Sequence, residues 1–234
     1  DLTDIIKVQK LKSDFVANVS HELRTPLQSI KLGLETINNG HAAKDLESQK
    51  KILPVVLQQT SRMENIVNDL LSLSRIELQE HIRPNEKVNL NDIISHSIEL
   101  HQEILKKNNI ECQFERESKN VKINGDRNRL IEVFNNLIDN GIKYSEKNKK
   151  ITITTKSENK NFLVTIKDQG IGISKENIPQ VTERFFRVDP AKSKEVGGTG
   201  LGLAIIKHIV NQHRAEMTIS SEINKGTEIS LSLI

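Results

Sequence analysis

The sequence contains no tryptophan and a single cysteine, and aromatic residues make up only 3% of its 234 residues. One thiol, Cys112, excludes an intramolecular disulfide framework and a cysteine-based metal cluster. We expect Cys112 to be a small residue of the core. The core must therefore be built from leucine, isoleucine and valine, with the six phenylalanines in support.

Long hydrophobic runs and a strong charge bias are also absent. No apolar run approaches the roughly 18 residues that span a bilayer, and the N-terminus lacks a signal-peptide pattern. The net charge is +3, with both signs interspersed, which argues against nucleic acid as a partner. We expect a cytoplasmic chain. Because the sequence starts at Asp1 rather than Met, we expect it to be a fragment of a longer, membrane-anchored protein.

Two long helical patterns open the chain, at residues 4–39 and 45–80. A short connection between them predicts an antiparallel hairpin. Because two helices alone bury little surface, we expect two copies to pair as a four-helix bundle. Pro26 and Pro54 interrupt these patterns, and either a functional hinge or a tolerated kink would explain them.

Segment 81–88 loses the periodicity and contains Pro84, which predicts a linker. The rest of the chain predicts helices at 89–108, 126–141 and 200–213, strands at 110–115, 120–123, 150–156, 161–168, 215–221 and 227–233, and a loop-rich segment at 169–197. Helices on one side of a mixed, mainly antiparallel sheet give an α+β sandwich. We therefore predict a multidomain chain: an all-α hairpin (1–80), a linker (81–88) and an α+β sandwich (89–234).

An unusual histidine lies in the segment FVANVSHELRTPL, residues 15–27. At about 100° per residue, one apolar stripe of this helix comprises Val16, Val19, Leu23, Leu27, Ile30 and Leu34. His21 points to nearly the opposite side, and Thr25 shares that side one turn later. Most exposed histidines are only solvated surface residues. His21 gains a chemical role only if the chain also binds a nucleotide donor with which the imidazole can react.

Two glycine-rich segments suggest such a donor, although the chain has no P-loop motif. Asp168 follows an alternating strand, and Gly170 and Gly172 come next. A buried carboxylate can accept a hydrogen bond from an adenine amino group, and glycines let the base approach the backbone. The run GGTGLGL (197–203) opens a helix whose free N–H groups suit phosphates. Each motif alone also occurs as an ordinary turn or loop tip.

A third segment carries polar residues on one helical face. Asn136, Asn140 and Lys143 fall at positions i, i+4 and i+7. Amide oxygens can ligate Mg²⁺, and a lysine can meet a phosphate. A polar face that serves solubility alone would look the same.

In these segments the chain resembles the catalytic core of a sensor histidine kinase. Five family motifs occur in the family's order: SHELRTPL (20–27, H box), NLIDNGIKYS (136–145, N box), DQGIGI (168–173, first glycine box), ERFFRVD (183–189, F box) and GGTGLGL (197–203, second glycine box). The resemblance implies a dimerisation and phosphotransfer hairpin followed by a GHKL-type ATPase domain. DLLSLSRIELQEH (69–81) is also similar to the phosphate-regulation sensors of this family.

The resemblance implies roles for individual residues. His21 would be the phosphoacceptor, Glu22 would orient its imidazole and help take its proton, and Thr25 would position water for dephosphorylating the partner. Asn140 and Asn136 would hold Mg²⁺, and Asp168 would bind adenine. The other implied nucleotide-site residues are Lys143, Tyr144, Gly170, Gly172, Phe186, Arg187, Gly198, Thr199, Gly200, Leu201 and Gly202, and Phe185 would pack beside them.

The implied reaction is autophosphorylation of His21 by ATP with Mg²⁺, followed by transfer to an aspartate of a response-regulator receiver domain. Thr182 and Arg214-Ala215 depart from the family pattern, for which we expect altered packing of the lid, the phosphate-side segment that contains Gly198, Gly200 and Gly202. Two alternatives stay open: a scaffold that binds ATP and uses the hairpin only for dimerisation and docking, and an ATP-driven clamp of the chaperone or topoisomerase kind. Transfer within one protomer and transfer between protomers both stay open.

Overall fold

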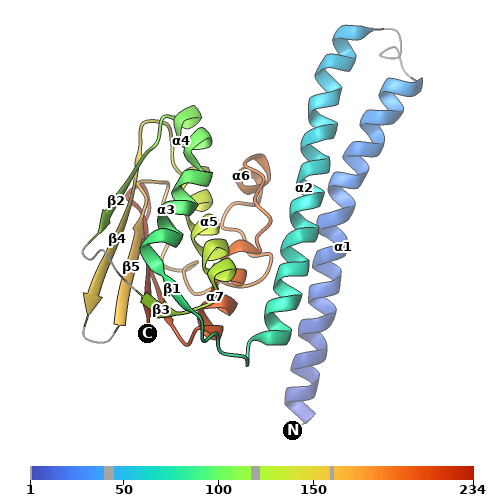
Figure 1. Ribbon diagram of the computed structural model, residues 1–234. Coiled ribbons are helices and arrows are strands. Elements are labelled where there is room, and N and C mark those ends of the chain that lie inside the picture. The colour runs from blue at the N-terminus through green and yellow to red at the C-terminus, as the bar shows by residue number, and fades with distance from the viewer. Residues whose placement is uncertain (1, 40–44, 117–121, 159–160) are drawn as a thin grey trace.

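The computed structural model describes residues 2–39, 45–116, 122–158 and 161–234 (Figure 1). Two long antiparallel helices, α1 (Leu2–Asn39) and α2 (Leu46–Gln79), form a hairpin that stands beside an α+β unit. The side chain of Asp45 caps α2 by accepting a hydrogen bond from the backbone N–H of Glu47. The predicted hairpin is confirmed. The kinks expected at Pro26 and Pro54 stay predictions, and both prolines lie inside continuous helices.

The two helices of the hairpin approach closely where α1 carries a glycine. A Cβ atom on Gly33 would lie 2.6 Å from Cγ2 of Val56 on α2, so a larger residue would push the helices apart. The apolar stripe of α1 is only partly covered, since Val16, Leu27 and Leu34 are 50% or more exposed. An apolar face that one chain leaves uncovered is what pairing of two hairpins requires.

The rest of the chain forms the α+β unit. Its helices are α3 (Leu90–Leu100), α4 (Gln102–Asn108), α5 (Arg127–Lys143), α6 (Pro190–Glu195) and α7 (Gly202–Gln212). Its strands are β1 (Lys87–Asn89), β2 (Glu111–Arg116), β3 (Lys122–Asn124), β4 (Lys150–Glu158), β5 (Asn161–Lys167), β6 (Glu216–Glu222) and β7 (Gly226–Leu233). Five strands form one sheet in the order β2-β4-β5-β7-β6, while β1 and β3 pair separately.

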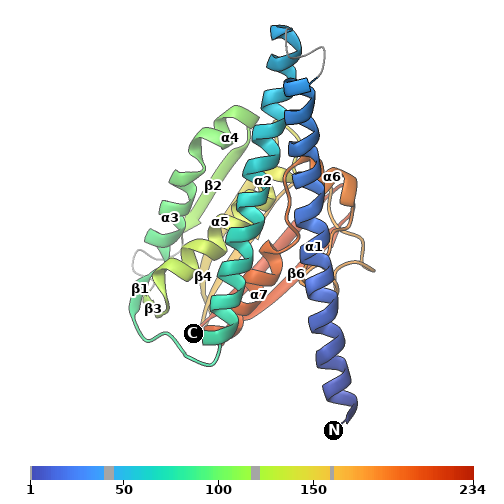
Figure 2. The ribbon, with the colours of Figure 1, turned by 90° about the vertical axis from the view of Figure 1, so that its right-hand side faces the viewer.

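The sheet is mixed, as predicted. Strands β2 and β4 are parallel, whereas the pairs β4-β5, β5-β7 and β6-β7 are antiparallel. Helices α3, α5 and α7 lie on the face of the sheet that is turned toward the hairpin (Figures 1 and 2). The predicted α+β sandwich is therefore confirmed.

Three local features differ from the sequence prediction. Segment 89–108, predicted as one helix, breaks at His101, whose ring Nδ1 bonds to the carbonyl of Ser97. The predicted loop contains the short helix α6, which Asp189 caps by accepting from two backbone N–H groups. A capping aspartate followed directly by Pro190 is a recognised helix start that the sequence prediction overlooked. Strand β1 begins at Lys87, inside the segment predicted to be linker.

One hydrophobic core joins the hairpin to the α+β unit. Leu73 and Ile76 of α2 are 1% and 0% exposed, and they belong to the same cluster as Phe134 of α5 and Ile205 of α7. Figure 2 shows α2 passing alongside α7. Cys112 packs against this core, and burial raises the pKa of its thiol to about 11. No helix that the structure describes is both long and apolar enough to cross a bilayer.

Candidate functional site

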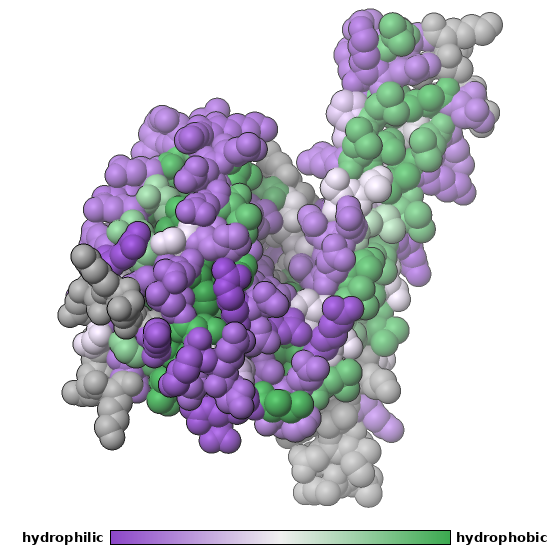
Figure 3. Space-filling model, in the orientation of Figure 1, coloured by the Kyte–Doolittle hydropathy of each residue, from purple (hydrophilic) through white to green (hydrophobic). Residues whose placement is uncertain are grey.

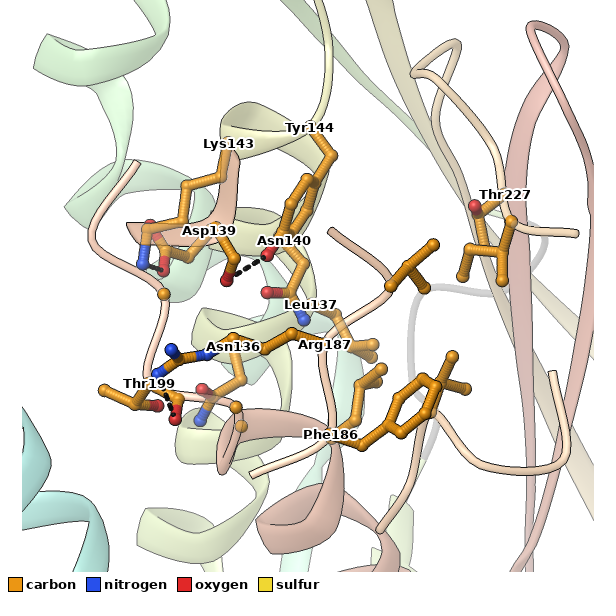
Figure 4. A pocket seen from close by; sticks show the side chains of 18 of the residues that line it. Asn136, Leu137, Asp139, Asn140, Lys143, Tyr144, Phe186, Arg187, Thr199 and Thr227 are labelled. Atoms are coloured by element: carbon orange, nitrogen blue, oxygen red, sulfur yellow. Dashed lines mark hydrogen bonds and ion pairs between the residues drawn. The ribbon is translucent and has the colours of Figure 1, made fainter. Parts of the chain in front are cut away.

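A cavity of about 350 Å³ lies between α5, the segment 181–203, the sheet and α2, which is a volume typical of small-molecule sites (Figure 4). It collects most of the predicted nucleotide residues: Asn136, Asn140, Lys143, Tyr144, Asp168, Gly172, Phe186, Arg187, Gly198, Thr199, Gly200 and Gly202. Gly170 and Leu201 lie beside this lining rather than in it. Segments far apart in the sequence thus converge on one hollow.

Asp168 lines the cavity next to the start of β7. Its Oδ1 accepts hydrogen bonds from the backbone N–H groups of Gly170 (2.8 Å) and Thr227 (3.1 Å). Burial raises the pKa of this carboxyl, and the two backbone hydrogen bonds act in the opposite direction. The surrounding apolar residues are Leu137, Ile166, Ile171, Ile173, Val181 and Ile229. A half-buried carboxylate beside apolar residues suits an amino group on a flat ring.

Two glycines of the site occupy backbone conformations that other residues rarely adopt. Gly172 has φ +70°, and a Cβ there would lie 2.0 Å from the carbonyl oxygen of Glu222. Gly200 has φ +76°, and a Cβ there would lie 2.9 Å from Cα of Phe185. Both loops therefore pack directly against neighbouring backbone, which only glycine permits.

The polar face of α5 lines another part of the cavity. Asn136 donates from Nδ2 to the carbonyl of Glu132 (2.9 Å), which leaves its Oδ1 beside Gly202 at the start of α7. Within the described part of the chain, the side-chain amide of Asn140 makes no hydrogen bond, and Figure 4 shows it directed into the cavity. Lys143 is paired with Asp139 at 2.6 Å.

The amide oxygens of this face are suited to a metal ion whose other ligands come mostly from water or a bound molecule. The described residues include no cluster of three or more His, Cys, Asp or Glu side chains able to hold a metal. Mg²⁺ usually binds through one or two protein oxygens together with substrate phosphates. The amide oxygens of Asn136 and Asn140 are compatible with that type of site.

The three predicted catalytic residues lie on α1, away from the cavity lining. His21 and Thr25 are exposed, as predicted, and the Thr25 hydroxyl donates to the backbone carbonyl of His21 at 3.2 Å. Their neighbour Glu22 is not exposed. Its side chain is 14% accessible and faces the α+β unit. His21 and Glu22 therefore present their side chains to different surroundings.

Glu22 is bound by two arginines. Arg187 donates from Nη1 to Oε1 (3.2 Å) and from Nη2 to Oε2 (2.9 Å), a bidentate pair. Arg62 of α2 donates to Oε2 at 3.2 Å. The side chains of Arg62 and Arg187 are 7% and 5% exposed, and burial together with the charge of Arg187 lowers the pKa of Arg62.

Sequence reasoning missed Arg62 and every other α2 residue of the site. Asn65, Asn68 and Asp69 line the cavity, and Asp69 Oδ2 accepts from Thr199 Oγ1 at 2.7 Å. Burial raises the pKa of Asp69. The available signal was the spacing of Arg62 and Asp69, which fall at three- and four-residue steps from the apolar residues Ile66 and Leu73 and so share their face of α2.

The F-box segment makes further contacts with the hairpin. Phe185 packs on Phe15 with ring centroids 5.9 Å apart, and the Arg184 guanidinium lies over the Phe15 ring at 5.3 Å. Arg184 also pairs with Glu77 of α2. Phe185 and Arg187 reach the helical domain, as the resemblance implies, and Phe186 lines the cavity.

Two family models match the chain. Residues 11–79 match the "His Kinase A (phospho-acceptor) domain", and residues 125–234 match the "Histidine kinase-, DNA gyrase B-, and HSP90-like ATPase". The chain belongs to the histidine kinase family. This confirms the family resemblance, and the second match also implies ATP binding by the α+β unit.

Known histidine kinases resemble the whole chain. A "Sensor protein kinase WalK" from Staphylococcus saprophyticus is 36% identical over 235 residues, and the match covers all of this chain but 38% of that protein. The structure of the Acinetobacter baumannii histidine kinase AdeS has a TM-score of 0.71 at 26% identity and covers 91% of this chain and 96% of that one. Histidine kinase ThkA, solved in complex with response regulator protein TrrA, shares the fold, with a TM-score of 0.75 at 24% identity over 97% of this chain and 63% of that chain. The phosphate-regulation subtype stays a prediction.

We expect Glu22→Ala to loosen the contact of residues 184–199 with α1 and α2 without unfolding the hairpin or the α+β unit. The substitution leaves two buried guanidinium groups facing each other with their shared counter-charge removed, a change that costs on the order of 3 kcal/mol. Hydrogen exchange at residues 184–199 should therefore accelerate. Glu64→Ala, an exposed glutamate on the same hairpin, is the control. Equal protection in both variants would show that the ion pairs do not hold the domains together.

Proposed function

We propose that this chain transfers the γ-phosphoryl group of ATP to His21 and then to an aspartate of a response-regulator receiver domain. One observation carries the proposal: the chain combines an exposed histidine on a helical hairpin with a nucleotide-sized cavity in an attached ATPase domain. A nucleophile and a donor site are the two parts that phosphoryl transfer requires. The match to a phospho-acceptor domain favours this function over an ATP-driven clamp.

In the proposed complex, adenine lies at the Asp168 end of the cavity and the phosphates lie toward α7. The free oxygen of Asp168 would accept a hydrogen bond from the adenine amino group, because Oδ1 is already held by two backbone donors. The phosphates would meet the N–H groups at the glycine-rich start of α7 and the ammonium group of Lys143. These contacts orient the terminal phosphoryl group toward the hairpin side of the cavity.

Magnesium would be held by the amide oxygens of Asn140 and Asn136. When bound, the ion supplies neutralisation of the negative charge that spreads over the phosphoryl oxygens during transfer. Lys143 would assist in the same neutralisation once a phosphate draws it away from Asp139.

His21 attacks as the neutral imidazole, because a protonated ring has no free lone pair. The proton on the other ring nitrogen must then be held or removed, and Glu22 is the adjacent carboxylate that we assign to this task. Two arginines occupy Glu22 in the present arrangement. We infer that Glu22 serves His21 only after Arg187 has left it.

The catalytic domain must also move before transfer can occur within one chain. The described cavity lining includes residues of α2 but none of α1, on which His21 lies. Movement on segment 81–88 would bring the cavity to His21 of the same chain, and pairing of two chains would offer the other protomer's His21. We propose hairpin 1–80 and catalytic domain 89–234 as the parts that move.

Thr25 supports a second activity on the same face. It lies one turn after His21, and its hydroxyl is exposed. We propose that it positions a water molecule for dephosphorylation of the response regulator. Because ATP and the regulator are both cytoplasmic, we place this core on the cytoplasmic side of a membrane-anchored sensor.

We also propose that two chains pair through the hairpin. Exposed apolar residues recur along α2 at helical spacing: Leu46, Leu53, Leu57, Val67, Leu71 and Leu78. Figure 3 shows hydrophobic side chains gathered along the hairpin beyond the catalytic domain. Such a stripe favours burial in a four-helix bundle of two hairpins.

His21→Gln should abolish phosphorylation and leave ATP binding unchanged, because the nucleophile and the nucleotide cavity lie on different domains. The measurement is incorporation of acid-labile, base-stable ³²P from labelled ATP, alongside titration with a fluorescent ATP analogue. His81→Gln removes another exposed histidine and should retain activity. Acid-labile label on the His21→Gln protein would refute the assignment.

Asn140→Ala should reduce Mg²⁺-dependent phosphorylation about 10- to 100-fold, the usual effect of removing a metal-site partner, while the fold persists. The rate is followed against Mg²⁺ concentration, with circular dichroism as the check on folding. Asn128→Ala on the same helix is the matched control, because Asn128 is exposed and lies outside the cavity. Wild-type turnover in Asn140→Ala at every Mg²⁺ concentration would place the metal elsewhere.

Leu71→Glu should convert the dimer into monomers, because Leu71 is 51% exposed in one chain and a charge there cannot be buried in a bundle. Light scattering coupled to size exclusion should give twice 26.5 kDa for the wild type and 26.5 kDa for this variant. Leu100→Glu alters an equally exposed leucine of the catalytic domain and should remain dimeric. A dimeric Leu71→Glu protein would exclude this stripe as the interface.

A further inference from the structure

Asp69 of α2 lies in the cavity that we assign to ATP, although it belongs to the hairpin. Its Oδ2 accepts a hydrogen bond from Thr199 Oγ1 at 2.7 Å. The same hydroxyl oxygen accepts from the backbone N–H of Leu201 at 3.2 Å, directly before α7. A carboxylate therefore already lies at the glycine-rich helix start that suits a phosphate.

Position along the cavity indicates which phosphate would compete with Asp69. Thr227, whose backbone N–H donates to Asp168, lies across the cavity from Asn136 and Thr199 (Figure 4), and Thr199 holds Asp69. The proposed adenine position is therefore on the side away from Asp69. The terminal phosphate of a nucleotide lies farthest from the base. It would therefore come closest to Asp69, and the inner phosphates would remain nearer the centre of the cavity.

The charges around Asp69 make a second anion unfavourable there. Burial is the main cause of the raised pKa of Asp69, and the charges of Glu132 and Asp139 raise it as well, whereas the hydrogen bond from Thr199 lowers it. Lys143 acts in the opposite direction but is itself paired with Asp139. The negative charge of a γ-phosphate would add to this repulsion as long as α2 stays in place.

In the present structure the catalytic domain is docked on α2 through Thr199 of the lid, and a bound γ-phosphate would contact the same part of the lid. Thr199 is held twice: its hydroxyl donates to Asp69, and its carbonyl accepts from Arg187 Nη2 at 2.8 Å. Arg187 in turn binds Glu22 of α1. Release of Thr199 from Asp69 would therefore loosen the lid and the F-box contact together.

We propose that Asp69 substitutes for the terminal phosphate of ATP on the lid, so that the docked arrangement accepts ADP and excludes ATP. Binding of ATP then favours separation of the catalytic domain from α2, and loss of the γ-phosphate favours its return. The nucleotide thus selects between two arrangements by its different affinity for each. This inference rests on the proposed function, because it requires that the cavity bind adenine nucleotides.

The test compares two nucleotides on two proteins. Asp69→Asn removes the charge but keeps an oxygen that can accept from Thr199. The dissociation constant of the Mg²⁺ complex of a non-hydrolysable ATP analogue should fall about tenfold, a usual size for a coupling between states, and that of ADP should stay within about twofold. Glu64→Gln removes a charge from an exposed position of the same helix and should change neither constant.

A second measurement follows the domains directly. Small-angle scattering of the wild-type chain should show a larger radius of gyration with the ATP analogue than with ADP. In Asp69→Ala, which removes both the charge and the hydrogen bond, the two nucleotides should give the same radius.

The possible failures are distinguishable. An unchanged ratio of the two dissociation constants in Asp69→Asn overturns the role of Asp69 and leaves the proposed kinase function intact. If the wild-type chain binds neither nucleotide, the proposed function fails, and this inference fails with it.

Discussion

The contact of the F-box segment with the hairpin depends on one carboxylate held between two arginines. Glu22 follows the proposed phosphoacceptor on α1, Arg62 comes from α2, and Arg187 comes from the F-box segment of the catalytic domain. Buried guanidinium groups are costly unless a counter-charge and hydrogen bonds compensate them. Glu22 is the counter-charge of both arginines. It therefore joins the hairpin to the catalytic domain at the position where the chemistry is proposed to start. Arg187 extends this connection to the lid through the carbonyl of Thr199.

Apolar burial and these polar contacts act at different places along α2. Leu73 and Ile76 near its C-terminal end are part of the core of the catalytic domain. Asp69 and Arg62, closer to the hairpin connection, make polar contacts that moderate rearrangements can break. Separating apolar side chains costs free energy in proportion to the apolar area that becomes exposed, whereas a charged group can exchange one ion-pair partner for another. The arrangement is therefore consistent with a catalytic domain that moves about the C-terminal end of α2, while the polar contacts nearer the hairpin connection change partners.

The sequence predicted the elements and the nucleotide end of the site better than the interface between domains. His21 is exposed as the helical periodicity required, and Asp168 with the glycine segments converges on one cavity. These residues are found because turn chemistry and helix periodicity are local properties. Arg62 and Asp69 were missed because their roles depend on contacts 40 and 130 residues away, with Glu22 and Thr199. Local periodicity could mark such residues only as polar groups on a buried face.

The exposure of His21 and the burial of Glu22 are two consequences of one helical geometry. Adjacent residues on a helix differ in direction by about 100°, which allows Glu22 to face the catalytic domain while His21 faces solvent. The nucleophile is therefore accessible to a partner protein in the same arrangement that withholds its carboxylate. In the proposed mechanism, exchange of phosphoryl groups with a regulator needs an accessible His21, whereas phosphorylation of His21 by ATP needs Glu22 free of Arg187. A single interface can thus separate the two tasks without any change in the fold of either domain.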